Sequence, residues 1–99
     1  MLIPFTQFHL PNGRKTVEHF DATSFPDEVK QKAQYLLGYG CRFEIELLRT
    51  GLVHADCSFS DEGPLANFVC PNDAQLVEQV RILIERSYEA LTALLPQET

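Results

Sequence analysis

Basic residues are scarce in this sequence, and that scarcity excludes a class of partners. The chain has 99 residues, with 8 Lys and Arg against 14 Asp and Glu, and a formal net charge of −6. Proteins that bind nucleic acids generally take much of their affinity from Lys and Arg on phosphates, so we expect no direct nucleic-acid binding. An acidic chain is also repelled by anionic lipid headgroups, so we expect no docking on membranes.

Long hydrophobic runs are missing as well. No stretch approaches the roughly 20 apolar residues that a membrane-spanning helix needs. The N-terminus carries no basic segment ahead of its short apolar run, so a signal peptide is not predicted. We therefore expect a cytoplasmic protein.

Cysteine is present in a small and odd number. The three cysteines, Cys41, Cys57 and Cys70, occur in a chain without a secretion signal, which indicates reduced thiols. They do not have the paired spacing that zinc sites show. All three fall on the apolar side of predicted strands, where a thiol behaves as a small apolar group. We therefore expect no metal-binding or catalytic role for them.

Signatures of catalysis are also missing. The sequence has no glycine loop of the kind that cradles phosphates and no Gly-x-Ser-x-Gly nucleophile turn. His9 and His19 fall on neighbouring predicted strands, where lone histidines are usually structural. The sequence therefore predicts no catalytic residue and no cofactor.

What the chain does contain is a strongly patterned segment, residues 41–71. Three alternating stretches separated by turn residues predict a three-stranded antiparallel meander. In the first hairpin, a three-residue loop of Arg49, Thr50 and Gly51 keeps the apolar residues on one face, and Gly51 takes the left-handed position. This register pairs Leu47 with Val53, Ile45 with Ala55, Phe43 with Cys57 and Cys41 with Phe59.

The second hairpin turns at residues 61–64. The same reasoning pairs Phe59 with Ala66, Cys57 with Phe68 and Ala55 with Cys70. One apolar face then extends across all three strands.

Two more strands are predicted ahead of the meander, at residues 2–10 and 15–21, with a turn at residues 11–13. Pro4 cannot donate a hydrogen bond to a ladder and therefore marks an edge or a strand end. The register of this hairpin is not determined, because no pairing places all its apolar residues on one face.

Helical patterns lie on both sides of the meander. Ser24 is the predicted N-cap of the first helix, which ends at Gly38 or Gly40. Residues 72–75 resemble a capping box with Asn72 as the cap, and the second helix extends to about Leu95.

The predicted order is ββαβββα within a single α+β domain of residues 1–99. Two amphipathic helices should cover one face of a mostly antiparallel five-stranded sheet, which makes a two-layer sandwich. The strand order in the sheet and the cover of its other face stay open.

The outward face of the meander carries the candidate site. The register places Glu46 opposite His54 and Glu44 opposite Asp56. Carboxylates and a histidine in this arrangement can bind a divalent metal or raise a carboxylate pKa for acid–base chemistry. Strand alternation alone also produces such a face, so a solvated polar surface is the competing interpretation.

Aliphatic side chains share this outward face and are the candidate interface residues: Leu48, Leu52, Leu65 and Val69. Aliphatic groups on a nominally solvated face indicate that part of it is covered. A homodimer is the commonest such arrangement. We expect its contact at the Leu48–Leu52 end, at the second helix, or at both, with the acidic residues at the rim.

Several short motifs resemble a family of small uncharacterised proteins carried by phages, prophages and integron cassettes. These motifs are residues 4–8, 11–14, 41–44, 50–51 and 70–72. The sequence departs from the family pattern where Asn12-Gly13 replaces an Asp-Gly turn and where Asp73 replaces a glycine. The resemblance supplies no activity and no catalytic residue. It implies accessory proteins of mobile elements, which bind a host or phage partner.

The sequence thus favours a non-enzymatic accessory protein that acts by protein–protein binding, as a homodimer. The alternative is a small metal-binding protein or enzyme that uses Glu44, Glu46, His54 and Asp56. The residues specify neither the partner nor a ligand.

Overall fold

The computed structural model describes residues 1–9, 14–60 and 63–95. Its elements follow the order β1 (Leu2–His9), β2 (Arg14–Asp21), α1 (Asp27–Gly38), β3 (Arg42–Leu47), β4 (Leu52–Ser58), β5 (Pro64–Pro71) and α2 (Gln75–Leu94). This confirms the predicted ββαβββα order. The turn predicted at residues 11–13 and residues 61–62 of the second turn lie outside the described residues.

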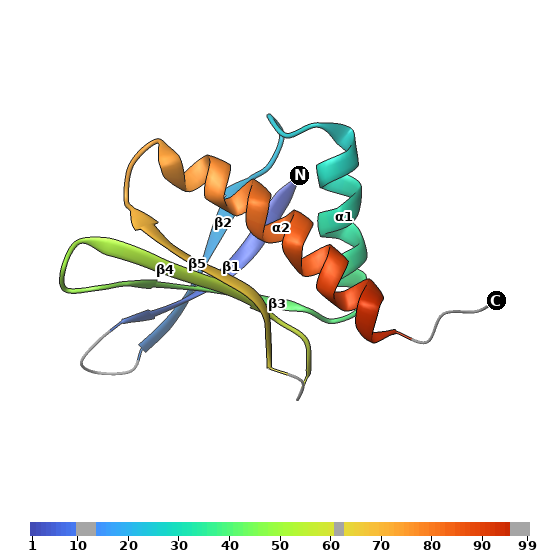
Figure 1. Cartoon of the computed structure of the whole chain (residues 1–99). Coiled ribbons are helices and arrows are strands. Elements are labelled where there is room, and N and C mark those ends of the chain that lie inside the picture. Colours follow the sequence, from blue (N-terminus) through green and yellow to red (C-terminus); the bar gives the residue numbers. More distant parts are fainter. Residues whose placement is uncertain (10–13, 61–62, 96–99) are drawn as a thin grey trace.

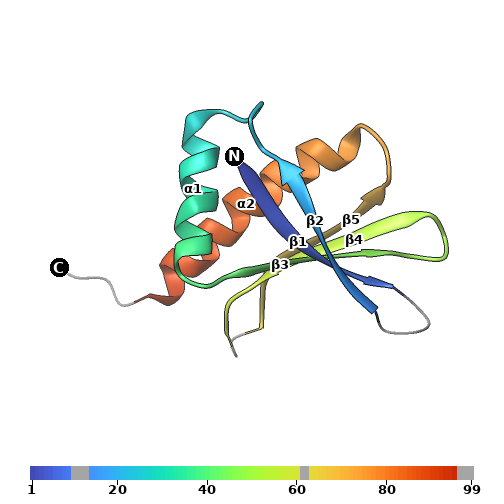
Figure 2. The ribbon, with the colours of Figure 1, turned by 180° about the vertical axis from the view of Figure 1, so that it is seen from behind.

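All five strands form one sheet in the order β2-β1-β3-β4-β5. Strands β1 and β3 are parallel, and the other neighbouring pairs are antiparallel. Both helices lie on the same side of this sheet, so the predicted two-layer α+β architecture is confirmed (Figure 1). The sheet is strongly twisted, and β1 and β2 run at a steep angle to β3 and β4 (Figure 2).

The first strand is internal, although Pro4 suggested an edge or a strand end. The paired positions of β1 and β3 begin at Phe5 and Phe43, so Pro4 lies beyond the β1–β3 ladder. On its other side Pro4 is paired with His19 of β2. Because Pro lacks the N–H that a second ladder would use, it is tolerated where one side of the strand is unpaired.

The register of the β3–β4 hairpin is confirmed. Leu47 pairs with Val53, and Phe43 pairs with Cys57. The Leu48 N–H donates to the Leu52 carbonyl at 2.8 Å, and Gly51 has a φ of +86°. A left-handed φ of this kind costs glycine no Cβ clash, which is why the three-residue loop closes here. The ladder ends at Arg42 and Ser58, so it does not include the expected Cys41–Phe59 pair.

The predicted register of the β4–β5 hairpin is wrong by two residues. The observed pairs are Cys57 with Ala66, Ala55 with Phe68 and Val53 with Cys70. A bulge follows Cys57, since Ser58 pairs with Pro64 and leaves an extra residue, Leu65, on β5. A shift of two residues keeps every side chain on its face, so the hydrophobic pattern does not distinguish the two registers.

The helix starts also differ from the prediction. α1 begins at Asp27 after Pro26, with no side-chain cap, so Ser24 does not cap it. At α2 the N-cap position is Ala74, with no side-chain cap, so Asn72 does not cap this helix. The neighbouring Asp73 carboxylate accepts a hydrogen bond from the Gln75 N–H at 2.8 Å. Both residue types accept such bonds, and sequence alone does not separate two neighbouring candidates.

The predicted end of α1 is confirmed. Gly40 has a φ of +82°, and the Cys41 N–H donates to the Leu36 carbonyl at 3.1 Å. This is the backbone-satisfying turn that glycine commonly permits at a helix end. α2 ends at Leu94, one residue before the predicted end.

The core lies between the sheet and the two helices. Phe43 is 2% exposed and packs against Phe5, with ring centroids 5.2 Å apart. The three cysteines are buried and unbridged, as predicted. The other core members are Ile3, Ala22, Phe25, Val29, Ala33, Leu36, Ala55, Phe68, Val80, Leu83, Ile84 and Leu91. Among the helices of the described residues, none has the length and apolar character to cross a membrane.

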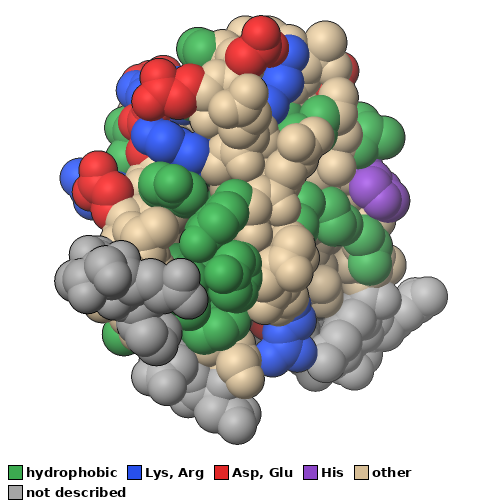
Figure 3. All heavy atoms as spheres, turned by 90° about the vertical axis from the view of Figure 1, so that its right-hand side faces the viewer, with side chains coloured by type: hydrophobic (Ala, Val, Ile, Leu, Met, Phe, Trp, Pro, Cys, Tyr) green, Lys and Arg blue, Asp and Glu red, His purple; other side chains and the backbone are tan. Residues whose placement is uncertain are grey.

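Aromatic side chains of α1 and α2 pack against each other on the outer side of the two helices. The Tyr35 ring lies 4.9 Å from that of Tyr39 and 5.2 Å from that of Tyr88, centroid to centroid. The Lys32 ammonium lies 5.4 Å from the centroid of the Tyr88 ring. Figure 3 looks onto this side and shows hydrophobic side chains gathered beside paired basic and acidic ones. These contacts stabilise the packing of α1 against α2.

Two leucines at the ends of elements are exposed, including Leu47, which the predicted register places on the core face. Leu47 is 54% exposed and Leu94 is 53% exposed. Leu47 ends β3 and Leu94 ends α2. Leu47 still lies on the helix-covered face, since it lines a hollow together with Leu76 of α2.

Candidate functional site

The helix-free face of the sheet holds the four candidate residues. Glu44 lies opposite Asp56, and Glu46 lies opposite His54, as the sequence predicted. Together with Ile45 they line a shallow hollow of about 200 Å³. We call this group, Glu44, Glu46, His54 and Asp56, the acidic cluster.

The acidic cluster lies near the middle of the sheet. On one side, Thr6 of β1 is paired with Glu44. On the other side, Asn67 of β5 is paired with Asp56. Because both neighbouring strands flank β3 and β4, the cluster is framed by other side chains and does not lie at an edge.

Asp56 is the most perturbed member of the cluster. Burial raises the pKa of its carboxyl group, the nearby Glu44 carboxylate raises it further, and His54 acts in the opposite direction. Its Oδ1 atom is buried and has no hydrogen-bond partner within the described residues. A buried carboxylate oxygen without a donor is unfavourable, and a like charge directly across the strand adds to the cost.

Ion pairs in the described part of the chain lie on the helices and do not neutralise this cluster. They join Lys30 to Asp27, Lys32 to Glu28, and Arg81 to Glu78 and Glu85. Arg42 shares the face of the cluster but is paired across the strands with Ser58. The negative charge of the cluster is therefore not compensated by an ion pair from residues 1–9, 14–60 or 63–95.

The side chains of the cluster are not grouped as the ligands of a metal ion. Among the residues whose placement is described, no group of three or more His, Cys, Asp or Glu side chains is arranged to hold a metal ion. The sequence pattern of the cluster is compatible with a metal site, and its geometry does not assemble one.

The predicted interface residues divide into two groups. Leu48 and Leu52 are half-buried at the closed end of the β3–β4 hairpin, and Val69 is 53% exposed beside His54. Leu65 differs from the prediction, because it packs against the buried core. It is the extra residue of the β4–β5 bulge, which changes the alternation of side chains.

Sequence reasoning missed two further aliphatic residues of this face. Val17 is paired with Thr6, which is paired with Glu44, so Val17 lies on the same face as the acidic cluster. Leu2 lies there by alternation along β1, and both side chains are more than half exposed. Their positions depend on the β1–β2 register and on the parallel β1–β3 pair, which the sequence pattern did not determine.

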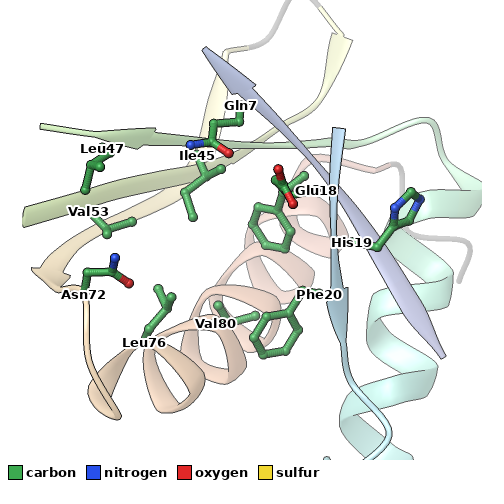
Figure 4. Close-up of a pocket in the computed structure, with 11 residues that line it drawn as sticks. Gln7, Glu18, His19, Phe20, Ile45, Leu47, Val53, Asn72, Leu76 and Val80 are labelled. Carbon is green, nitrogen blue, oxygen red and sulfur yellow. The ribbon is translucent and has the colours of Figure 1, made fainter. Parts of the chain in front are cut away.

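A second hollow lies on the opposite, helix-covered face. Its volume is about 260 Å³, and it separates β2 from the first turns of α2 (Figure 4). We call it the helix-side pocket. It is lined by Phe5, Gln7, Glu18, His19, Phe20, Ile45, Leu47, Val53, Asn72, Leu76 and Val80.

Comparison with protein-family models, curated protein sequences and solved structures gives no match for this chain, so its function is argued from these surfaces alone.

Proposed function

We propose that this chain is a protein-binding domain without enzymatic activity, and that its acidic cluster contacts a basic segment of a partner protein. The partner class follows from charge: a Lys or Arg side chain supplies the positive charge and the N–H donors that this cluster lacks. The proposal extends to the origin suggested by the sequence motifs, an accessory protein of a mobile element with a host or phage partner.

The observation that carries the proposal is the opposition of Glu44 and Asp56. These two carboxylates lie directly across the β3–β4 ladder, and no Lys or Arg of the described residues forms an ion pair with either of them. An arginine guanidinium placed over the pair would donate to both carboxylates. Charge-assisted hydrogen bonds of this kind are among the strong ones in proteins.

The surroundings of the cluster also suit a protein contact. Leu48, Leu52 and Val69 lie around one side of it, and Val17 and Leu2 lie on the β1–β2 side. Apolar groups around a charged centre exclude water when a partner binds, which strengthens the central polar contact. The face without helices therefore combines a polar centre with aliphatic side chains on two of its sides.

A second copy of the chain fits the centre of this face poorly, because two acidic clusters would repel each other. The homodimer expected from the sequence therefore stays a proposal for the Leu48–Leu52 end or for α2. A dimer of that form leaves the acidic cluster free for a basic partner.

Fluorescence anisotropy with a labelled peptide that contains arginine and leucine tests the proposal. The double variant Glu44→Gln, Asp56→Asn should bind this peptide about tenfold more weakly than the unmodified chain, because it removes both carboxylates. The matched control is Asp27→Asn, Glu89→Gln, which makes the same change in net charge on the helices. The control should bind like the unmodified chain.

Equal weakening in both double variants would show that only net charge matters, and it would overturn the proposal. Capture from a host lysate adds the partner's identity. Proteins retained by the unmodified chain and by the control, but lost with Glu44→Gln, Asp56→Asn, should be basic. Captured proteins that do not depend on the cluster would also contradict the assignment.

Melting curves separate this proposal from the metal-binding alternative. A ligand that binds the folded chain raises its melting temperature by mass action. Divalent metal ions should leave the melting temperature unchanged, whereas the arginine peptide should raise it. A rise with metal ions that is lost in Glu44→Gln, Asp56→Asn would favour the metal site instead.

A further inference from the structure

The helix-side pocket is separate from the acidic cluster and has a different chemistry. It lies on the face of the sheet that the helices cover, whereas the cluster lies on the opposite face. Its outer walls come from β2 and from the start of α2, and β3 and β4 form its floor (Figure 4). The twist of the sheet turns β1 and β2 away from the direction of β3 and β4 (Figure 2).

Most of the pocket lining is apolar. Ile45 and Val53 lie on its floor, with Phe20 on one wall and Leu76 and Val80 on the other (Figure 4). Leu47 borders the open end and is 54% exposed. An apolar group that enters this space removes both its own surface and these side chains from water, which favours binding.

Few lining residues are polar, and the charged one among them is negative. Glu18 is the acidic residue in it, the amides of Gln7 and Asn72 are neutral, and no Lys or Arg is present among the described lining residues. Glu18 extends from β2 toward the pocket, whereas His19 points to the other side of the strand (Figure 4). Glu18 takes part in no ion pair with the rest of the described chain.

The volume limits the size of the ligand. An apolar cavity of about 150 Å³ holds a benzene molecule, and pockets for drug-sized ligands begin at about 300 Å³. A pocket of about 260 Å³ therefore has room for one ring and a short chain. The rings of Phe5 and Phe20 are placed to pack against an aromatic body.

We propose that the helix-side pocket binds a small amphipathic amine, with its aromatic or branched apolar body between β3 and α2 and its ammonium group at the Glu18 carboxylate. The amides of Gln7 and Asn72 supply further hydrogen-bonding groups at the rim. An anionic ligand of the same shape is disfavoured by Glu18 and by the net charge of −6. This ligand site is independent of the protein-binding function of the opposite face.

Three probes of similar shape test this proposal: 2-phenylethylamine, the neutral 2-phenylethanol and the anionic 3-phenylpropionate. Binding to the full chain is followed by chemical shifts of the methyl groups of Ile45, Val53, Leu76 and Val80 in NMR titrations. The amine should bind in a saturable way and shift these methyl signals. The alcohol should bind about fivefold more weakly, which is the range of an exposed charge pair, and the anion more weakly still.

The variant Glu18→Gln should lower the affinity for the amine to that for the alcohol and leave the alcohol unaffected. The control Glu89→Gln removes an exposed carboxylate of α2 and should change neither affinity. Melting curves verify that both variants fold. Equal affinity of amine and alcohol, unchanged amine binding in Glu18→Gln, shifts confined to other methyl groups, or a pocket blocked by a second copy of the chain would each overturn the proposal.

Discussion

Glu44 and Asp56 lie directly opposite each other across the β3–β4 ladder, and Asn67 is the next neighbour of Asp56 on β5. Burial and the Glu44 carboxylate together raise the pKa of Asp56. The folded chain therefore holds a proton on Asp56 at a higher pH than the unfolded chain does. In linkage terms, ionised Asp56 destabilises the fold at neutral pH.

The variant Asp56→Asn should be more stable than the unmodified chain at pH 7, by about 0.5–1 kcal/mol, because it removes the like-charge opposition. This difference in the free energy of unfolding should shrink as the pH falls through the raised pKa of Asp56, and it should disappear below the unfolded value near 3.8. Urea unfolding over this pH range measures it. The control Glu46→Gln faces His54 and should show no such gain, and a loss of stability in Asp56→Asn at pH 7 would contradict the prediction.

The three thiols should react slowly in the folded chain. All three are buried, and burial raises the pKa of Cys57 to about 12, so little thiolate is present near neutral pH. Labelling with Ellman's reagent should be at least about tenfold slower in the folded chain than in guanidinium chloride, where all three thiols should react. Rapid labelling of more than one cysteine in the folded chain would be inconsistent with their placement.

The variant Phe43→Ala should lower the free energy of unfolding by about 3–5 kcal/mol, because it removes a buried ring that packs against Phe5. Denaturant unfolding followed by circular dichroism measures the change. The control Phe59→Ala removes a half-buried ring outside the ladder and should cost less. A loss below about 1 kcal/mol for Phe43→Ala would mean that the ring does not fill the core.

Replacement of the buried Ser87 should increase the stability of the chain, in contrast to Phe43→Ala. The Ser87 hydroxyl is fully buried in α2 beside the Cys57 thiol, a weak hydrogen-bonding group, and no nitrogen or oxygen of the described residues is its partner. Ser87→Ala should therefore stabilise the chain by about 1 kcal/mol, since it removes a poorly satisfied polar group and improves helix propensity. Thr92→Ala in the same helix is the comparison, because the Thr92 hydroxyl donates to the Tyr88 carbonyl at 3.0 Å. Thermal melts should show a smaller gain, or a loss, for Thr92→Ala.

The homodimer prediction is tested by light scattering at micromolar concentration. A contact at the Leu48–Leu52 end should give twice the mass of the chain, and the double variant Leu48→Glu, Leu52→Glu should give a monomer. Burying each leucine is worth roughly 1.5–3 kcal/mol, so the variant should also melt at a lower temperature. A monomeric parent whose double variant melts at the same temperature would remove the argument for a dimer.

The fold was predictable where the turn residues and the alternation of apolar side chains specify the same strand register. The β3–β4 register followed from Gly51 and from the apolar alternation, because a shift by one residue exposes the core face. The β4–β5 register did not follow, because a shift by two residues preserves the faces. Only the bulge after Cys57 distinguishes the two, and a bulge leaves little trace in a single sequence.

The acidic cluster was predictable, and its apolar surroundings were predictable only in part. Glu44, Glu46, His54 and Asp56 belong to one hairpin, so local pairing places them together. Val17 and Leu2 join the same face through the pairing of β1 with β3, which are far apart in the sequence. The helix-side pocket likewise depends on the sheet twist and on α2, both properties of the assembled domain.

The internal position of β1 has a consequence for synthesis of the chain. The β1–β2 hairpin leaves the ribosome before β3, which completes the pairing of β1 and follows only after α1. Until then one edge of β1 has unpaired backbone N–H and C=O groups, the arrangement that promotes aggregation with other chains. Slow translation between residues 22 and 42 would therefore prolong the most aggregation-prone stage of the nascent chain.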